Sequence, residues 1–240
     1  MSTPDFRDIW VYLSTSPLLG LTLTLLAYQI AHALYLKLGS HPLANPVALA
    51  VALIVAILTF TGTPYAVYFE GAQFVHFLLG PATVALAVPL YAQWPRLKKL
   101  FGASMLALAA GSVASVISVW YIAQALGAQR QTLLSLAPKS VTTPIAMGIS
   151  EKIGGLPSFT AVLVILTGVT GAIIAPSLLR ASGIRDDAIQ GFAIGMCAHG
   201  IGTARAFQLS ETAGAFSALA MGLNGVVTSI VVPIAVNWLG

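Results

Sequence analysis

A lysine lies in an apolar stretch of the sequence, between two prolines and beside three hydroxyl side chains. The polar residues of this run, 136–148, are Lys139, Ser140, Thr142 and Thr143, and its helix breakers are Pro138 and Pro144. Proline lacks a backbone N–H and interrupts a helix, so carbonyls and a half-helix N-terminus become available there. An ammonium beside a helix N-terminus favours an anion. The alternative is that Lys139 extends to a membrane interface and the prolines only bend a helix.

A second apolar run carries a histidine and an arginine on either side of two glycines. Its candidate residues are His199, Gly200, Gly202, Thr203 and Arg205. Glycines permit a helix break that exposes backbone N–H groups, and a guanidinium binds a carboxylate through two parallel bonds. His199 is the natural proton carrier near neutral pH. Otherwise His199 is a hydrogen-bonded residue of the helix bundle and Arg205 lies at a membrane interface. With Cys197, His199 supplies too few ligands for a metal.

A third run, 69–89, is interrupted by a Gly-Pro pair and a further proline. The breakers are Gly80, Pro81 and Pro89, and the polar candidates are His76 and Thr83. His76 is most simply interfacial or hydrogen-bonded within the bundle. Asn224, between two glycines, is predicted to face other helices. Asn45 before Pro46 is typical of a helix cap. No nucleophile–base pair and no cofactor motif is recognisable, so the sequence predicts neither an enzyme nor a cofactor.

The elements that position these residues are transmembrane helices. Only 8% of the 240 residues are charged and 58% are hydrophobic, whereas a soluble domain carries about 25% charged residues. This composition excludes soluble enzymes and nucleic-acid binders. The net charge of +4 does not indicate nucleic acid, because the basic residues are scattered and a basic excess is typical of cytoplasmic loops.

The pattern predicts an all-α polytopic membrane protein with broken or re-entrant helices, forming one domain over 1–240. Since a spanning helix needs roughly 20 apolar residues, seven to eight of the apolar segments are expected to cross the membrane. The segments are 17–37, 43–61, 71–93, 101–126, 131–150, 158–180, 187–209 and 212–239.

The basic loops at 94–100 and 180–187 are both expected on the cytoplasmic side. Three segments separate them, and three full crossings would place them on opposite sides. Segment 131–150, with its prolines and lysine, is therefore predicted not to cross. Backbone of that kind survives in a membrane only where protein or a wet cavity surrounds it.

A faint internal repeat accompanies this pattern. Leu106, Gly111 and Ile117 match Leu163, Gly168 and Ile174 at an offset of 57 residues, and Leu79, Pro81 and Val84 match Leu136, Pro138 and Val141 at the same offset. Transporters commonly contain repeats with paired broken helices.

At these same runs the sequence resembles the LrgB/CidB family of bacterial membrane proteins. The matching stretches are 71–90 (GAQFVHFLLGPATVALAVPL), 136–155 (LAPKSVTTPIAMGISEKIGG), 167–172 (TGVTGA), 199–206 (HGIGTARA) and 214–225 (GAFSALAMGLNG). The resemblance covers 41–240, and the first 40 residues carry no recognisable signature of this family.

The resemblance implies two functions. One is an antiholin-like control of murein hydrolase export and autolysis, exerted with a small LrgA/CidA-type membrane partner. The other is transport of small carboxylates, because the related plant plastid protein exchanges glycolate and glycerate and some bacterial pairs are associated with pyruvate uptake. We expect a carrier of glycolate, glycerate, pyruvate or lactate in the plasma membrane that works by alternating access, is coupled to protons and forms a homodimer.

Overall fold

The computed structural model describes residues 17–39 and 44–239, and all regular structure in these ranges is helical. The chain divides into two compact units, 1–85 and 86–240. The first contains α2 (Pro17–Lys37), α3 (Pro46–Thr61), α4 (Tyr65–Phe77) and α5 (Leu79–Ala85). The second contains α6 (Ala87–Ala92), α7 (Trp94–Ala125), α8 (Arg130–Leu136), α9 (Thr143–Ile153), α10 (Pro157–Ala181), α11 (Asp187–Leu209) and α12 (Glu211–Leu239). The expected all-α class is confirmed, and the single domain over 1–240 stays a prediction.

In the first unit, α2 packs against α3 and α4. Ala27, Ala31 and Ala50 form a small core between α2 and α3, where short side chains let the helices approach closely. The predicted cap at Asn45 is confirmed: its Oδ1 accepts hydrogen bonds from the N–H groups of Val47 and Ala48. This carboxamide satisfies two backbone donors that have no partner inside the helix.

Five stretches are long and apolar enough to cross a membrane, namely 18–37, 65–92, 94–125, 157–181 and 211–239. Three of the eight expected segments are not among them. Segment 43–61, whose first residue lies outside the described part, forms the 16-residue helix α3. Segment 131–150 is broken as expected, and segment 187–209, expected as one helix, reverses at its middle.

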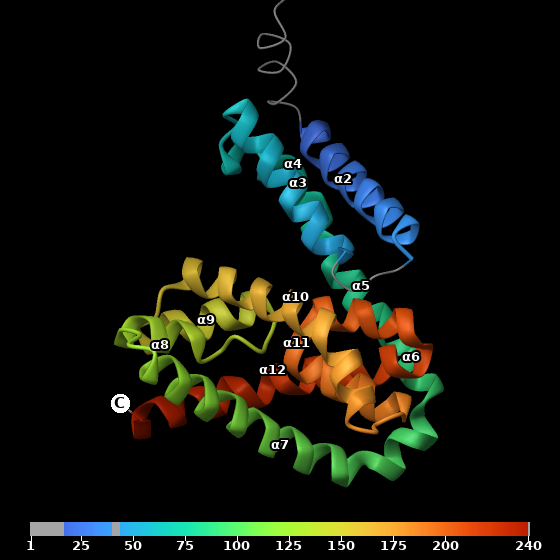
Figure 1. Cartoon of the computed structure of the whole chain (residues 1–240), viewed down its shortest axis with the longest axis vertical. Coiled ribbons are helices and arrows are strands. Elements are labelled where there is room, and N and C mark those ends of the chain that lie inside the picture. Colours follow the sequence, from blue (N-terminus) through green and yellow to red (C-terminus); the bar gives the residue numbers. More distant parts are fainter. Residues whose placement is uncertain (1–16, 40–43, 240) are drawn as a thin grey trace, which may run out of the picture. The chain divides into compact units, whose positions relative to one another are not determined.

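Three long helices frame the second unit. α7 and α12 run along its length, and α10 lies on its other side; α8, α9, the end of α7 and the C-terminal end of α12 gather at one end (Figure 1). A helix rises about 1.5 Å per residue, so the 25 residues of α10 extend about 37 Å. This exceeds the roughly 30 Å of a bilayer's hydrocarbon core.

Residues 130–153, hereafter hairpin 1, enter and leave at the same end of this frame. α8 ends at Leu136, a turn covers 137–142, and α9 runs back toward the start of α10. Both arms are fastened to the start of α10: the Leu156 N–H donates to Ser135 Oγ at 2.8 Å, and Thr160 Oγ1 lies 2.7 Å from Ser150 Oγ. With 11 residues, α9 extends about 16 Å, which is half of a bilayer core.

Residues 187–209, hereafter hairpin 2, also turn back on themselves. His199 has φ 42° and ψ −133° inside α11, a conformation that costs a non-glycine residue energy. A Cβ added to Gly202 would lie 3.0 Å from the carbonyl oxygen of Ile194, although residues eight apart in a straight helix are about 12 Å apart. The segments on either side of His199 therefore lie against each other.

The close packing of α11 on α12 depends on residues without side chains. A Cβ at Gly191 would collide with the backbone of Ala213, and one at Gly195 would collide with the backbone of Ser217. Small residues at helix contacts are typical of membrane bundles. The first arm of hairpin 2 therefore lies directly on the first turns of α12.

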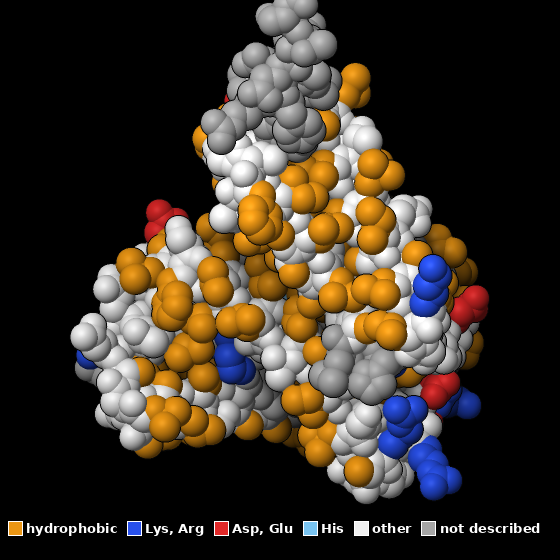
Figure 2. All heavy atoms as spheres, turned by 45° about the horizontal axis from the view of Figure 1, so that its top comes forward, with side chains coloured by type: hydrophobic (Ala, Val, Ile, Leu, Met, Phe, Trp, Pro, Cys, Tyr) orange, Lys and Arg blue, Asp and Glu red, His pale blue; other side chains and the backbone are white. Residues whose placement is uncertain are grey.

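The described surface is largely apolar, with few charged side chains on the face in view (Figure 2). Large hydrophobic residues are widely exposed, including Phe60, Leu126 and Trp238. In a soluble protein such a surface would drive association. In this chain it fits lipid as the surrounding medium.

Candidate functional site

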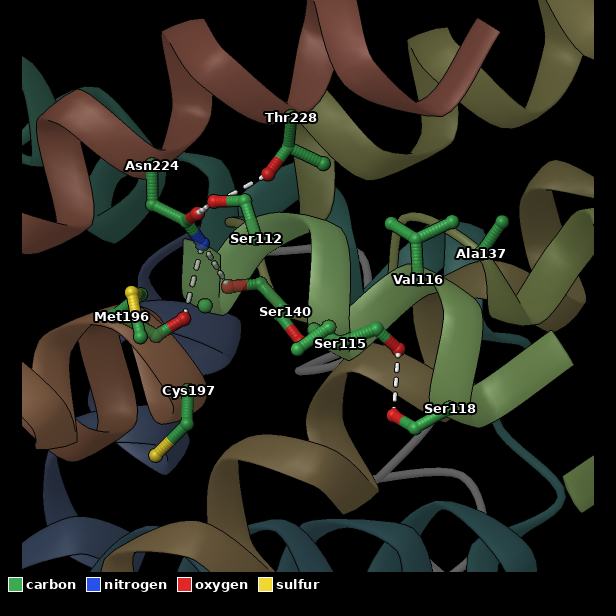
Figure 3. A pocket seen from close by; sticks show the side chains of 12 residues that line it. Ser112, Ser115, Val116, Ser118, Ala137, Ser140, Met196, Cys197, Asn224 and Thr228 are labelled. Carbon is green, nitrogen blue, oxygen red and sulfur yellow. Dashed lines mark hydrogen bonds between the residues drawn. The ribbon is translucent and has the colours of Figure 1, made fainter. Parts of the chain in front are cut away.

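Two cavities lie between the middles of α7, α10, α11 and α12, where the turn of hairpin 1 reaches them. Cavity A, about 260 Å³, is lined mainly by α7, α12 and the turn; cavity B, about 470 Å³, is lined mainly by α10. Three residues line both cavities: Ser115, Ser140 and Cys197. The labelled residues of cavity A include Ser112, Ser115 and Ser118 of α7 and Asn224 and Thr228 of α12 (Figure 3).

Lys139 lines cavity B and is held by two hydroxyl groups. Its Nζ donates to Ser115 Oγ and to Ser140 Oγ, each at 3.2 Å, and the two oxygens are 3.0 Å apart. Within residues 17–39 and 44–239 an ion pair joins Arg96 and Asp186, and no carboxylate pairs with Lys139. A cation without a counter-ion is costly at membrane depth, so this position is suited to an anionic ligand.

Asn224 connects both hairpins to α7 and α12. Its Nδ2 donates to the carbonyl oxygens of Ser140 at 3.1 Å and Met196 at 2.9 Å. Its Oδ1 accepts from Ser112 at 2.7 Å and from Thr228 at 3.2 Å (Figure 3). Asn224 is 2% exposed, and every polar atom of its side chain has a partner. The prediction that it faces other helices is confirmed.

His199 lies buried at the turn of hairpin 2. Its Nε2 is 3.0 Å from the Val164 carbonyl oxygen of α10, and its own carbonyl accepts from Thr203 Oγ1 at 2.9 Å. Thr203 Oγ1 also lies 2.9 Å from Ser217 Oγ. Neither His199 nor Thr203 lines cavity A or B, so the expected proton carrier and the expected carboxylate ligand pack between helices.

The other residues predicted from the two runs do not line these cavities. Arg205 donates to Gln208 Oε1 at 2.7 Å, near the end of α11. Thr142 occupies the N-cap position of α9 without a capping bond from its side chain, and Thr143 begins the helix. Gly202 is buried inside hairpin 2, and Gly200 is exposed at its turn. The predicted meeting of Lys139, His199 and Arg205 in one cavity does not occur in cavities A and B.

The predicted helix breaks are displaced by a few residues. Pro138 lies in the turn of hairpin 1 and Pro144 in the first turn of α9, where a missing N–H costs nothing. Gly80 and Pro81 lie in the first turn of α5, just after the break at Leu78. Pro89 lies in α6, after the break at Leu86. The side chains of His76 and Thr83 lie outside the described residues.

The sequence reasoning missed several residues of the cavities, above all Ser112, Ser115 and Thr228. They are small hydroxyl residues in long apolar helices. Two sequence features could have indicated them. Gly111 directly precedes Ser112, and Thr228 lies one helical turn after Asn224. Hydroxyls of this kind also bond their own helix backbone, so type alone does not identify them.

The N-terminal ends of α7 and hairpin 2 are joined by an ion pair. Arg96 Nη2 contacts Asp186 Oδ2, while Asp186 Oδ1 caps α11 by accepting from the N–H groups of Ala188 and Ile189. The two basic loops that the charge pattern placed on one side are therefore neighbours.

Comparison with known proteins gives one consistent family. Residues 24–238 match the sequence profile described as the LrgB-like family. YwbG of Bacillus subtilis (strain 168) is 38% identical over 222 residues, covering 92% of this chain and 98% of that protein. The protein named "Antiholin-like protein LrgB" of Bacillus cereus (strain B4264) is 32% identical over 225 residues, covering 94% of this chain and 98% of that protein. No solved structure matches.

Proposed function

Since the chain belongs to the LrgB-like family, we propose that it is a multi-pass carrier of small monocarboxylates in the plasma membrane. The observation that carries the proposal is Lys139, a cation in the wall of cavity B that is bonded to two serine hydroxyls. Among the described residues no carboxylate pairs with it.

A carboxylate fits the chemistry of this position. It would neutralise the Lys139 ammonium, and the hydroxyls of Ser115 and Ser140 can rotate to donate hydrogen bonds to it. Further hydroxyls on the wall of cavity B belong to Thr167 and Thr170, which suit a hydroxy or keto group. A water molecule occupies about 30 Å³, so about 260 and 470 Å³ hold an acid of two or three carbons with a few waters.

The membrane topology supports alternating access. α7, α10 and α12 are long enough to cross, whereas the arms of the two hairpins extend only about half of a bilayer core. The ion pair Arg96–Asp186 fits the assignment of both basic loops to the cytoplasmic face. Non-helical backbone at mid-depth is typical of substrate sites in secondary transporters.

The first contact with the carboxylate is assigned to Lys139, Ser140 and Ser115 rather than to the second run. Thr142, Thr143, Gly200, Gly202, Thr203 and Arg205 stay candidates for a state in which the hairpins have moved. Proton coupling through His199 also stays a prediction, since its Nε2 is engaged by the Val164 carbonyl.

A second candidate function is antiholin-like control of murein hydrolase export and autolysis. It is favoured by relatives that match nearly the whole chain and are named "Antiholin-like protein LrgB". It requires a membrane partner, for which an LrgA/CidA-type protein is the candidate, and a homodimer is a further proposal. Changes in carbon flux or in the proton gradient would connect the two functions.

Uptake into proteoliposomes separates these functions. Labelled glycolate, glycerate, pyruvate and lactate are offered to the purified full chain, with protein-free liposomes as the control. A carrier gives saturable uptake of at least one acid that the others inhibit. Non-saturable passage of unrelated solutes would indicate a channel, and no flux for any acid would refute the carrier and leave the regulatory function.

A further inference from the structure

The second unit contains the same arrangement twice, at an offset of 57 residues. Each copy is a hairpin followed by a long helix: hairpin 1 with α10, and hairpin 2 with α12. The first arms begin at 130 and 187, the turn of hairpin 1 ends at 142 and that of hairpin 2 lies at 199, and the long helices contain prolines at 176 and 233. The faint sequence repeat has the same offset, but it relates 79–117 to 136–174, so the likeness of these two copies rests on the structure alone.

The two copies run in opposite directions. Hairpin 1 ends directly before the N-terminus of α10, and hairpin 2 begins directly after its C-terminus. Because α10 extends the full length of the unit, the hairpins enter from opposite ends. Each long helix also packs on the hairpin of the other copy: a Cβ at Gly168 of α10 would lie 2.6 Å from His199, and one at Gly225 of α12 would lie 2.9 Å from Ile145.

Both turns are held by one side chain. Asn224 donates one hydrogen bond to Ser140, in the turn of hairpin 1, and one to Met196, close to the turn of hairpin 2. Carbonyl oxygens only accept, so both bonds must come from Nδ2, and the hydroxyls of Ser112 and Thr228 hold Oδ1 on the opposite side. The carboxamide is thus fixed in the one orientation that binds both hairpins.

We infer that hairpins 1 and 2 are gates at opposite faces of one site, and that Asn224 is the positioning residue that keeps both closed. The inference rests on the proposed carrier function. Opening toward one face separates one turn from Asn224 and breaks one N–H···O bond, while the second bond keeps the other gate shut. Both bonds are made in this structure, so both turns are held on Asn224.

A buried position in the turn of hairpin 1 reports on these gates. Ser140 is 8% exposed, whereas Cys197, the one cysteine of the sequence, is already exposed. The reporter is therefore Ser140→Cys in a chain that also carries Cys197→Ser, and this chain without a further change serves as the wild type of the comparison. It is treated in liposomes with a membrane-impermeant methanethiosulfonate, and the labelling rate of the thiol introduced at position 140 is measured by mass spectrometry. Asn224→Asp keeps the shape of the side chain and removes both N–H donors. Thr228→Val is the matched control, because it removes only a bond to Oδ1.

Asn224→Asp is expected to label at least five times faster than the wild type, since each lost hydrogen bond changes a closing equilibrium by about fivefold. Thr228→Val is expected to label within about twofold of the wild type. Equal rates for the wild type and Asn224→Asp would overturn the inference, and so would equal acceleration by Thr228→Val. No carboxylate is present, so the result is independent of whether the chain transports one.

A second measurement covers the case in which Asn224→Asp does not fold. Ser140→Cys places a thiol of similar size in the turn of hairpin 1, where it lines the same cavities as Cys197. A short bifunctional thiosulfonate is expected to join the two cysteines and to lock both gates. Failure to cross-link would overturn the proximity of the turns, and full uptake activity of cross-linked protein would overturn their role as gates.

Discussion

Replacing Lys139 by methionine removes the charge and keeps the side chain unbranched up to Cε, without Nζ. A carboxylate about 4 Å from an ammonium gains about 4 kcal/mol at an effective dielectric constant near 20, and desolvation of both groups offsets part of it. Hydrogen bonds to charged groups contribute about 1.5–3 kcal/mol net. Since about 1.4 kcal/mol is tenfold in affinity, Lys139→Met should weaken carboxylate binding by about 10- to 100-fold.

The assay compares the concentration dependence of uptake in proteoliposomes for the wild type, Lys139→Met and Lys139→Arg. Met leaves the Ser115 and Ser140 hydroxyls, 3.0 Å apart, free to bond each other, so the fold should be kept. Arg keeps the charge and should retain more affinity than Met. A neutral amide analogue of the substrate should compete poorly in the wild type and equally poorly in Lys139→Met. An unchanged KM for Lys139→Met would refute the assignment of the anion to this lysine.

Three further predictions concern stability. Gly195→Val should prevent folding, because its side chain would collide with the Ser217 backbone; a monodisperse, transport-competent protein would contradict the packing of hairpin 2 on α12. Thr160→Val removes a buried hydroxyl that bonds Ser150 and should cost about 1–3 kcal/mol, read as a lower thermal midpoint in detergent. Asp186→Asn keeps the helix cap and loses only a half-exposed ion pair, so its thermal midpoint should stay near that of the wild type. Asp186→Ala also removes the cap and should cost about 1 kcal/mol of stability. Equal midpoints for the two variants would show that the cap contributes nothing.

The sequence predicts those features of the fold whose free-energy cost arises within one short stretch of the chain. Long apolar helices follow from composition, and the break before α9 follows from Pro138 and Pro144, because neither proline can continue a helix from the residues before it. Lys139 is identifiable for the same reason, since a lysine in an apolar run is expensive in any fold that buries it.

The reversal at His199 depends on contacts that no local pattern contains. Gly200 and Gly202 permit a break, but they are equally compatible with a continuous helix. The turn is held from outside, by the Val164 carbonyl and by the close contact of Gly195 with α12. The cavity wall was missed for a related reason: Ser115 differs from any other serine of an apolar helix only through the lysine that reaches it.

The half-length arms of the hairpins also constrain how the chain enters the membrane during synthesis. α7, α10 and α12 each provide a continuous apolar stretch, which suffices for lateral release from a translocon into lipid. The arms of hairpins 1 and 2 do not, since each is only 7 to 12 residues long and their turns expose backbone groups that lipid cannot satisfy. Hairpin 1 should therefore insert into the membrane only together with α10, and hairpin 2 only together with α12. The insertion of α12 completes the polar interior around both hairpins, because the carboxamide of Asn224 binds the turns of both.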